Sequence, residues 1–102
     1  MKFDGFFVSD EIHEREVTLG DGSKHVLHFR ELSVTDLRRF AFAERSDDEE
    51  VRAESVAKLI AASLCEADGK PAMTAEQAKR LKPKVADAIF QAVMSVNDPG
   101  KA

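Results

Sequence analysis

The sequence predicts a single α+β domain in which an N-terminal antiparallel β-hairpin packs on about four α-helices. Within residues 13–30, apolar and polar side chains alternate on both sides of a glycine-containing turn, as in a hairpin. From residue 33 onward, apolar side chains instead recur with the period of amphipathic helices. A length of 102 residues fits one domain. We divide the domain into an arm (1–12), the hairpin (13–30), a helical part (33–97) and a flexible tail (98–102).

The arm is apolar but has no clean period, and it carries phenylalanines at Phe3, Phe6 and Phe7. We expect it to form either an edge strand, which would be a third strand of the sheet, or a segment that packs on the rest of the domain.

The hairpin turns at Asp21-Gly22. This pair supplies the positive φ angles that a two-residue type I′ turn needs. A three-residue loop with a glycine bulge fits the same residues and shifts the strand register by one, so both turns remain open.

The first helix is predicted over residues 31–45, where Ser33 is a suitable N-cap because its hydroxyl accepts a bond from a backbone N–H. At about 100° per residue, one face of this helix is apolar and should face the core. Phe42 points away from that face, toward the side that carries arginines. The predicted core face consists of Val34, Leu37, Phe40 and Ala41.

The second helix is predicted over residues 46–69 and begins with acidic residues, which the helix dipole favours. Its wide apolar stripe should lie in the core, and Gly69 is the natural C-terminal stop. Cys65 would then lie near the end of this helix. The stripe consists of Val56, Leu59, Ile60, Ser63, Leu64 and Ala67.

Two further helices are marked by local signals at their first residues. Thr74 and Gln77 have the spacing of a capping box, which predicts a short third helix. Pro83 suits the first position of a fourth helix over residues 83–96. The positions of the fourth helix predicted to face the core are Val85, Ala86, Ile89, Val93 and Val96.

Composition excludes several classes of function. A formal net charge of −4 disfavours general nucleic-acid binding, because affinity for phosphates comes from Lys and Arg. A single cysteine cannot form an internal disulfide, which fits a reducing compartment. No stretch approaches the roughly 20 apolar residues of a membrane span, and the apolar run at residues 6–8 is too short for a signal peptide. We therefore expect a soluble cytoplasmic protein with neither nucleic acid nor membrane as partner.

The segment "SLCEADGKPAMT", residues 63–74, is the first candidate for chemistry. A calcium loop with Gly69 at its sixth position would need carboxylates at Leu64 and Ala75, and neither residue supplies one. Cys65 near a helix C-terminus has no group that would stabilise its thiolate. We therefore interpret this segment as the bend between two helices.

The histidines do not form a predicted metal site. His25 and His28 lie three apart on one predicted strand, so they point to opposite faces of the sheet. The sequence has neither a phosphate-binding glycine motif nor a nucleophile motif. These observations predict a protein that is not an enzyme and that has no catalytic, cofactor-binding or metal-binding residues.

Two surface features are candidates for binding a partner. The basic cluster "KRLKPK", residues 79–84, is interpreted as cations near a helix C-terminus rather than as a nucleic-acid patch. An outward aromatic residue ringed by arginines matches the composition of protein interfaces. The alternative is that the arm folds over Phe42. The predicted partner-binding residues are Phe6, Phe7, Arg38, Arg39, Phe42 and Arg45.

A hairpin turning at "GDGS" leads through "FRELSVTDL" into a helix and then an acidic gap, "SDDEE". A long apolar segment ending "LIAASLCEADGKPAMT" is followed by "AEQAKRL" and a last apolar helix. The order of these features resembles the small tail assembly chaperones of long-tailed, siphovirus-like phages and prophages. The resemblance covers residues 14–96 and includes no catalytic motif.

This resemblance implies a non-enzymatic protein that acts in the cytoplasm of the bacterial host. Such a chaperone binds the tape measure protein, keeps it soluble while tail-tube subunits polymerise around it, and is absent from the mature virion. Homo-oligomer formation is left open. The alternatives are a structural tail or head–tail joining subunit that stays in the virion, and a small nucleic-acid-binding regulator that uses residues 79–84.

The resemblance also generates a prediction about the gene. Families of this kind often make a longer product by a minus-one ribosomal frameshift near the end of the gene. One of the possible codon sets for Pro99-Gly100-Lys101 is CCG-GGA-AAG, which contains the slippery heptamer G-GGA-AAG in the correct frame. We expect the gene to carry such a heptamer, followed by an overlapping open minus-one frame. Sequencing the gene decides this. If the bases under Gly100 and Lys101 form no slippery heptamer, or if no open minus-one frame overlaps, slippage at this position is ruled out.

Overall fold

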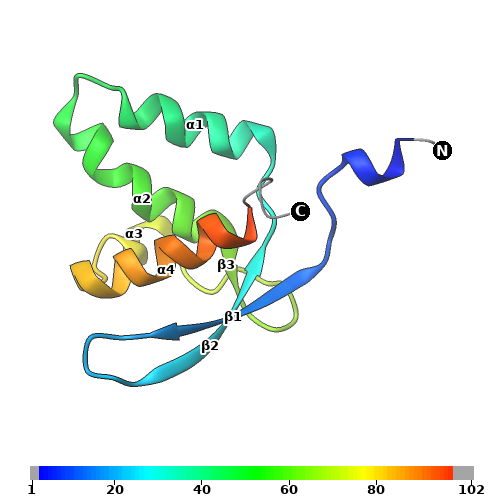
Figure 1. Cartoon of the computed structure of the whole chain (residues 1–102). Coiled ribbons are helices and arrows are strands. Elements are labelled where there is room, and N and C mark those ends of the chain that lie inside the picture. The colour runs from blue at the N-terminus through cyan, green and yellow to red at the C-terminus, as the bar shows by residue number, and fades with distance from the viewer. Residues whose placement is uncertain (1–2, 98–102) are drawn as a thin grey trace.

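A three-stranded antiparallel sheet and four α-helices build the domain, in a computed structural model that describes residues 3–97. The predicted α+β class, with a hairpin packed on helices, is confirmed. Helix α4 lies along the hairpin, α2 packs on α4 and on the sheet, and α1 lies against α2 (Figure 1). The elements are η1 (Asp4–Phe6), β1 (Ile12–Thr18), β2 (Lys24–Arg30), α1 (Val34–Glu44), α2 (Glu49–Ser63), β3 (Leu64–Cys65), α3 (Ala75–Ala78) and α4 (Pro83–Val96).

The hairpin turn is the three-residue loop rather than the two-residue turn. The Leu19 N–H donates to the Ser23 carbonyl at 2.9 Å, and the Gly22 N–H donates to the Leu19 carbonyl at 2.9 Å. Gly22 has a φ of 87°, the conformation that a glycine bulge needs. The Asp21 carboxylate accepts a bond from the Ser23 N–H and closes the loop.

The predicted end of the second helix was wrong. Helix α2 ends at Ser63, and the next two residues are the strand β3, which pairs with β2 through Phe29↔Leu64 and His28↔Cys65. Cys65 therefore lies in the sheet and not in a helix. The third strand of the sheet comes from this segment and not from the N-terminal arm.

Gly69 does not stop a helix but turns the chain after β3. The Glu66 N–H donates to the Lys70 carbonyl at 2.8 Å, and the Gly69 N–H donates to the Glu66 carbonyl at 2.9 Å. With a φ of 89° at Gly69, this loop repeats the geometry of the hairpin loop. An Asp-Gly pair suits both a helix end and a tight turn, and pairing with β2 selects the turn.

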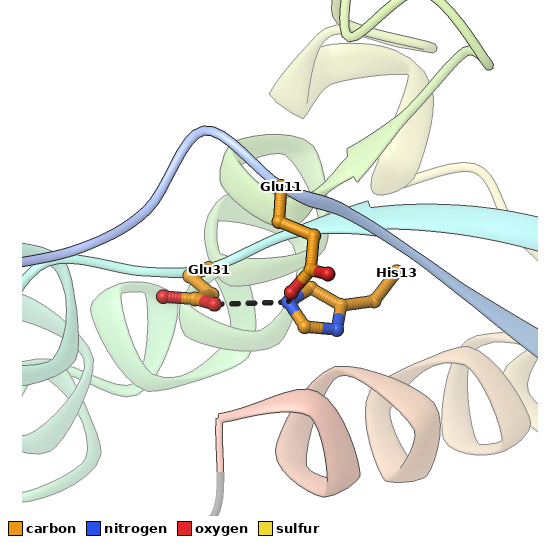
Figure 2. Close-up of side chains that lie close together, drawn as sticks. All are labelled: Glu11, His13 and Glu31. Atoms are coloured by element: carbon orange, nitrogen blue, oxygen red, sulfur yellow. Dashed lines mark hydrogen bonds and ion pairs between the residues drawn. The ribbon is translucent and has the colours of Figure 1, made fainter. Parts of the chain in front are cut away.

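The N-terminal arm forms no strand. It contains the short 3-10 helix η1, and Phe6 and Phe7 are 78% and 66% exposed. The arm is attached where it meets the sheet, because Glu31 accepts hydrogen bonds from Ser9 and is joined to His13 (Figure 2).

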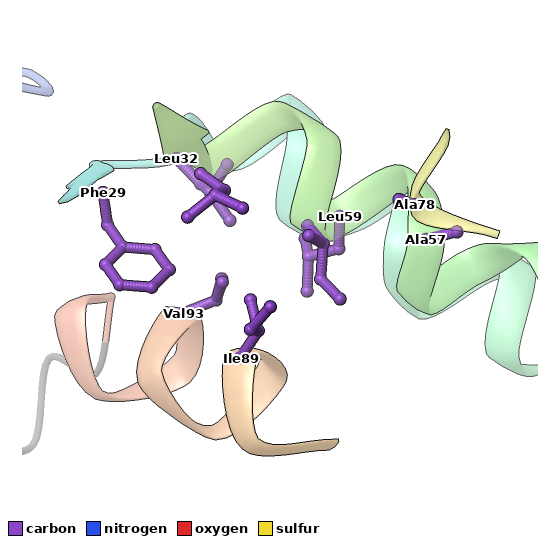
Figure 3. Packing of buried hydrophobic residues seen from close by; sticks show 9 residues of the cluster. Phe29, Leu32, Ala57, Leu59, Ala78, Ile89 and Val93 are labelled. Carbon is purple, nitrogen blue, oxygen red and sulfur yellow. The ribbon is translucent and has the colours of Figure 1, made fainter. Parts of the chain in front are cut away.

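The core lies between β2, α2 and α4, and Figure 3 shows its buried side chains. Phe29, Ile60 and Val93 are fully buried and come one from each of these elements. The predicted start of α4 at Pro83, the cap at Ser33 and the capping box of Thr74 and Gln77 are all present. The stripe of α2 is buried as predicted at Leu59, Ile60 and Ser63, whereas Ala67 lies beyond the helix and is exposed.

The predicted core face of α1 was only half right. Leu37 and Phe40 pack on the core, and the Phe40 ring centroid lies 5.6 Å from that of Phe90 in α4. Val34, which is 68% exposed, and Ala41 face solvent instead. Helix α1 makes its main helix contact with α2 alone, so only a narrow stripe of it is covered.

The predicted flexible tail and the candidate slippery position lie outside the described residues. Within residues 3–97, no helix combines the length and the apolar character that crossing a membrane requires.

The two similar loops give a prediction about stability. A side chain at a positive φ costs about 1–2 kcal/mol, so both Gly22→Ala and Gly69→Ala should be destabilising. A Cβ on Gly69 would lie 3.3 Å from Ile12 Cδ1, whereas a Cβ on Gly22 would meet nothing within 4 Å. We expect Gly69→Ala to lower the free energy of unfolding more than Gly22→Ala in urea denaturation. Equal losses would show that Ile12 does not restrict this loop.

Candidate partner-binding surface

One face of α1 presents apolar and cationic side chains to solvent, on the side away from α2. We call it the α1 outer face. Phe42 is 71% exposed and lies one turn from both Arg38 and Arg45. Among the residues that the structure describes, neither of these arginines is in an ion pair. The α1 outer face consists of Val34, Arg38, Ala41, Phe42 and Arg45.

Arg39 lies at the edge of this surface, beside a groove between α1 and α2. The groove has a volume of about 240 Å³ and a mainly apolar lining. Phe40 and Leu59 form part of its floor, and Arg39 and Lys58 line it as well. A partner that covers Phe42 and extends past Arg39 would therefore meet this apolar groove.

The phenylalanines of the arm lie elsewhere. In Figure 1 the arm runs beside the first turn of α1, while Phe42 belongs to the last turn of that helix. The alternative that the arm folds over Phe42 was wrong, because Phe6, Phe7 and Phe42 are all largely exposed. The structure thus brings the four predicted α1 residues together and separates them from the two in the arm.

Sequence reasoning missed one member of the α1 outer face. Val34 was assigned to the core because it shares a helical face with Leu37 and Phe40 by angle alone. Its helical angle was a usable signal, because Val34 also shares a face with Arg38, Ala41 and Arg45.

Cys65 lies in a different environment from the one predicted. It is 3% exposed, within the β3 strand, and burial raises the pKa of its thiol. A thiol that is both buried and protonated is a poor nucleophile and a poor metal ligand.

The cations of the basic cluster at residues 79–84 differ in their surroundings. The Lys79 ammonium lies 2.8 Å from a Glu76 oxygen and 3.0 Å from a Glu54 oxygen, and these hydrogen bonds raise the pKa of Lys79. Lys82 precedes α4 as its N-cap residue and is exposed. These contacts support the interpretation of the cluster as cations that belong to helix ends.

The histidines of β2 lie apart, as predicted. His25 contacts Ser23 at 3.0 Å, and His28 lies 3.4 Å from a Glu14 oxygen. Sequence reasoning did not find that His13 lies beside Glu31, since that contact depends on strand pairing. Hydrogen bonds from the Ser9 N–H and from His13 and Ser9 side chains lower the pKa of Glu31, so its carboxyl group is charged at neutral pH.

A comparison with protein families gives the chain a class. Residues 1–97 match a family model described as phage tail assembly chaperone, TAC. No curated protein and no solved structure matches the chain. The matched range includes every described element, the α1 outer face and the arm, and it confirms the resemblance drawn from the order of hairpin and helices. The chain belongs to the phage tail assembly chaperone family.

Proposed function

We propose that the protein is a non-enzymatic chaperone that binds the tape measure protein and supports the polymerisation of tail-tube subunits around it. Membership of the tail assembly chaperone family supplies the class of function. The observation that carries the proposal is the α1 outer face, where an exposed phenylalanine lies among arginines that have no ion-pair partner in the described part of the chain. Exposed aromatic and arginine side chains together are typical of protein-binding surfaces.

Binding would combine apolar burial with charge. Covering Phe42 and Val34 removes apolar surface from water, which is the main source of affinity in such contacts. Arg38 and Arg45 are seven residues apart, so they are best matched by carboxylates placed about two helical turns apart on the partner. The expected target is therefore an amphipathic helix of the tape measure protein, with acidic residues beside its apolar stripe. The charges would set the register and speed association.

The arm would provide a second contact. Phe6 and Phe7 are exposed at the far side of the domain from the last turn of α1. When one chain offers two weak contacts, formation of the first contact holds the partner close to the second. The effective concentration of the partner at the second contact is then raised. An extended partner such as the tape measure protein could be held at both places. The proposed partner-binding residues are Phe6, Phe7, Arg38, Arg39, Phe42 and Arg45.

The proposed place of action is the cytoplasm of the bacterial host, with no retention in the mature virion. The competing proposal is a structural tail or head–tail joining subunit with the same fold. Mass spectrometry of purified particles separates the two, because only a structural subunit would be present in them. A nucleic-acid-binding regulator is disfavoured by the net charge of −4 and by the ion pairs of Lys79.

The function is tested by comparing two phenylalanines of α1. Phe42→Ala should change the free energy of unfolding by less than about 0.5 kcal/mol, because the side chain is exposed, but it should reduce the amount of soluble tape measure protein on co-expression. Phe40→Ala should cost about 3 kcal/mol, the lower end of the range for buried aromatics, because the ring packs on Phe90. Thermal melts and co-expression pull-downs measure the two effects.

The matched control is Val26→Ala, which truncates an apolar side chain of β2 that is 58% exposed and far from α1 in the sheet. It should leave the recovery of tape measure protein unchanged. Equal recovery with Phe42→Ala and with Val26→Ala would contradict the assignment of the α1 outer face. Unfolding of the domain by Phe42→Ala would show instead that this residue belongs to the core.

A further inference from the structure

Three side chains with metal-ligating atoms meet where the arm joins the sheet (Figure 2). His13 Nε2 lies 2.9 Å from Glu31 Oε2 and 3.5 Å from Glu11 Oε2. One ligand atom from each residue lies within 4.8 Å of the other two. The side chains of His13 and Glu31 are 21% and 29% exposed, whereas that of Glu11 is 69% exposed and leaves a path from solvent.

Strand pairing places these residues on one face of the hairpin. His13 is opposite Phe29 and Ile12 is opposite Arg30. Extending this register by one residue sets Glu11 opposite Glu31, on the same face as His13. Two carboxylates directly opposite each other are unfavourable unless a positive charge lies between them. The structure therefore holds two negative groups and an imidazole around one small space.

We propose that Glu11, His13 and Glu31 bind a divalent transition metal ion of the Zn²⁺ class. Ligand bonds of about 2.0–2.1 Å in a tetrahedral zinc site put ligand atoms roughly 3.3 Å apart, and the two distances from His13 Nε2 lie on either side of that value. Three protein ligands leave a fourth position for water. This proposal replaces the expectation that the chain has no metal-binding residues.

The ligand set favours zinc-like ions over calcium or magnesium. An imidazole nitrogen together with two carboxylates suits Zn²⁺, Co²⁺ or Ni²⁺, whereas Ca²⁺ and Mg²⁺ prefer six or more oxygens, including water. The ion would take the place of the hydrogen bond between His13 and Glu31. Metal binding through Glu11 would also order the arm, because Glu11 belongs to the segment that leads back to Phe6 and Phe7.

Glu31 is already oriented for this role by the arm. The Ser9 N–H donates to Glu31 Oε1 at 3.1 Å, and the Ser9 hydroxyl donates to Oε2 at 2.9 Å. Hydrogen bonds of this kind fix the carboxylates that hold metal ions. The other two histidines lack this arrangement, because His28 is near a single carboxylate and His25 contacts a serine.

The test uses the full chain, untagged and stripped of metal by a chelator. Isothermal titration with Zn²⁺ should give one site per chain, and His13→Ala should weaken its dissociation constant at least tenfold. Glu11→Gln should weaken binding too, and it carries little risk of unfolding because Glu11 is exposed. The matched control, His25→Ala, removes an exposed histidine of the same hairpin and should leave the dissociation constant unchanged.

Co²⁺ provides a second measurement on the same variants. A tetrahedral visible spectrum without a thiolate-to-cobalt band should appear in the parent chain and be lost with His13→Ala. The proposal is overturned if the parent chain shows no saturable Zn²⁺ binding, or if His13→Ala and His25→Ala bind equally. A thiolate band would place the ion at Cys65 and would overturn it as well.

Discussion

The pairing of β2 with β3, the short strand that directly follows α2, is the constraint on which the rest of the structure depends. Phe29 pairs with Leu64, and both side chains are buried. Two hydrogen bonds from side chains to backbone carbonyls also join these segments. The Ser63 hydroxyl donates to the Arg30 carbonyl at 2.8 Å, and an Arg30 Nη donates to the Ala62 carbonyl at 3.1 Å. Hairpin and helices are thereby fixed as one body.

The exposed surface follows from this arrangement. With α2 held between the sheet and α1, the first helix has α2 as its main neighbour and buries only the stripe around Leu37 and Phe40. The opposite side remains uncovered, and it is there that Phe42 lies with Arg38 and Arg45, which form no ion pair within residues 3–97. An exposed aromatic ring between two arginines matches the composition of protein-binding surfaces, and this match is the basis for proposing a contact here.

Local signals predicted most of the fold, and non-local pairing accounts for the errors. Pro83 and the Thr74 capping box marked helix starts, because each acts within one turn of the chain. Strand β3 has two residues and is a strand only because β2 lies beside it, so no periodicity could reveal it. The cluster of Glu11, His13 and Glu31 escaped prediction for the same reason. At the candidate surface, the angle of Phe42 was predictable, while the exposure of Val34 depended on which side of α1 packs on α2.

The central claim is that the α1 outer face binds the tape measure protein, and site-specific photo-cross-linking tests it most directly. A photoreactive phenylalanine derivative at position 42 keeps an aromatic side chain at the proposed contact. The matched position is Gln91, which is exposed on α4. The account predicts cross-links to co-expressed tape measure protein from position 42 and none from position 91. Cross-links of equal yield from both positions, or from position 91 alone, would contradict it.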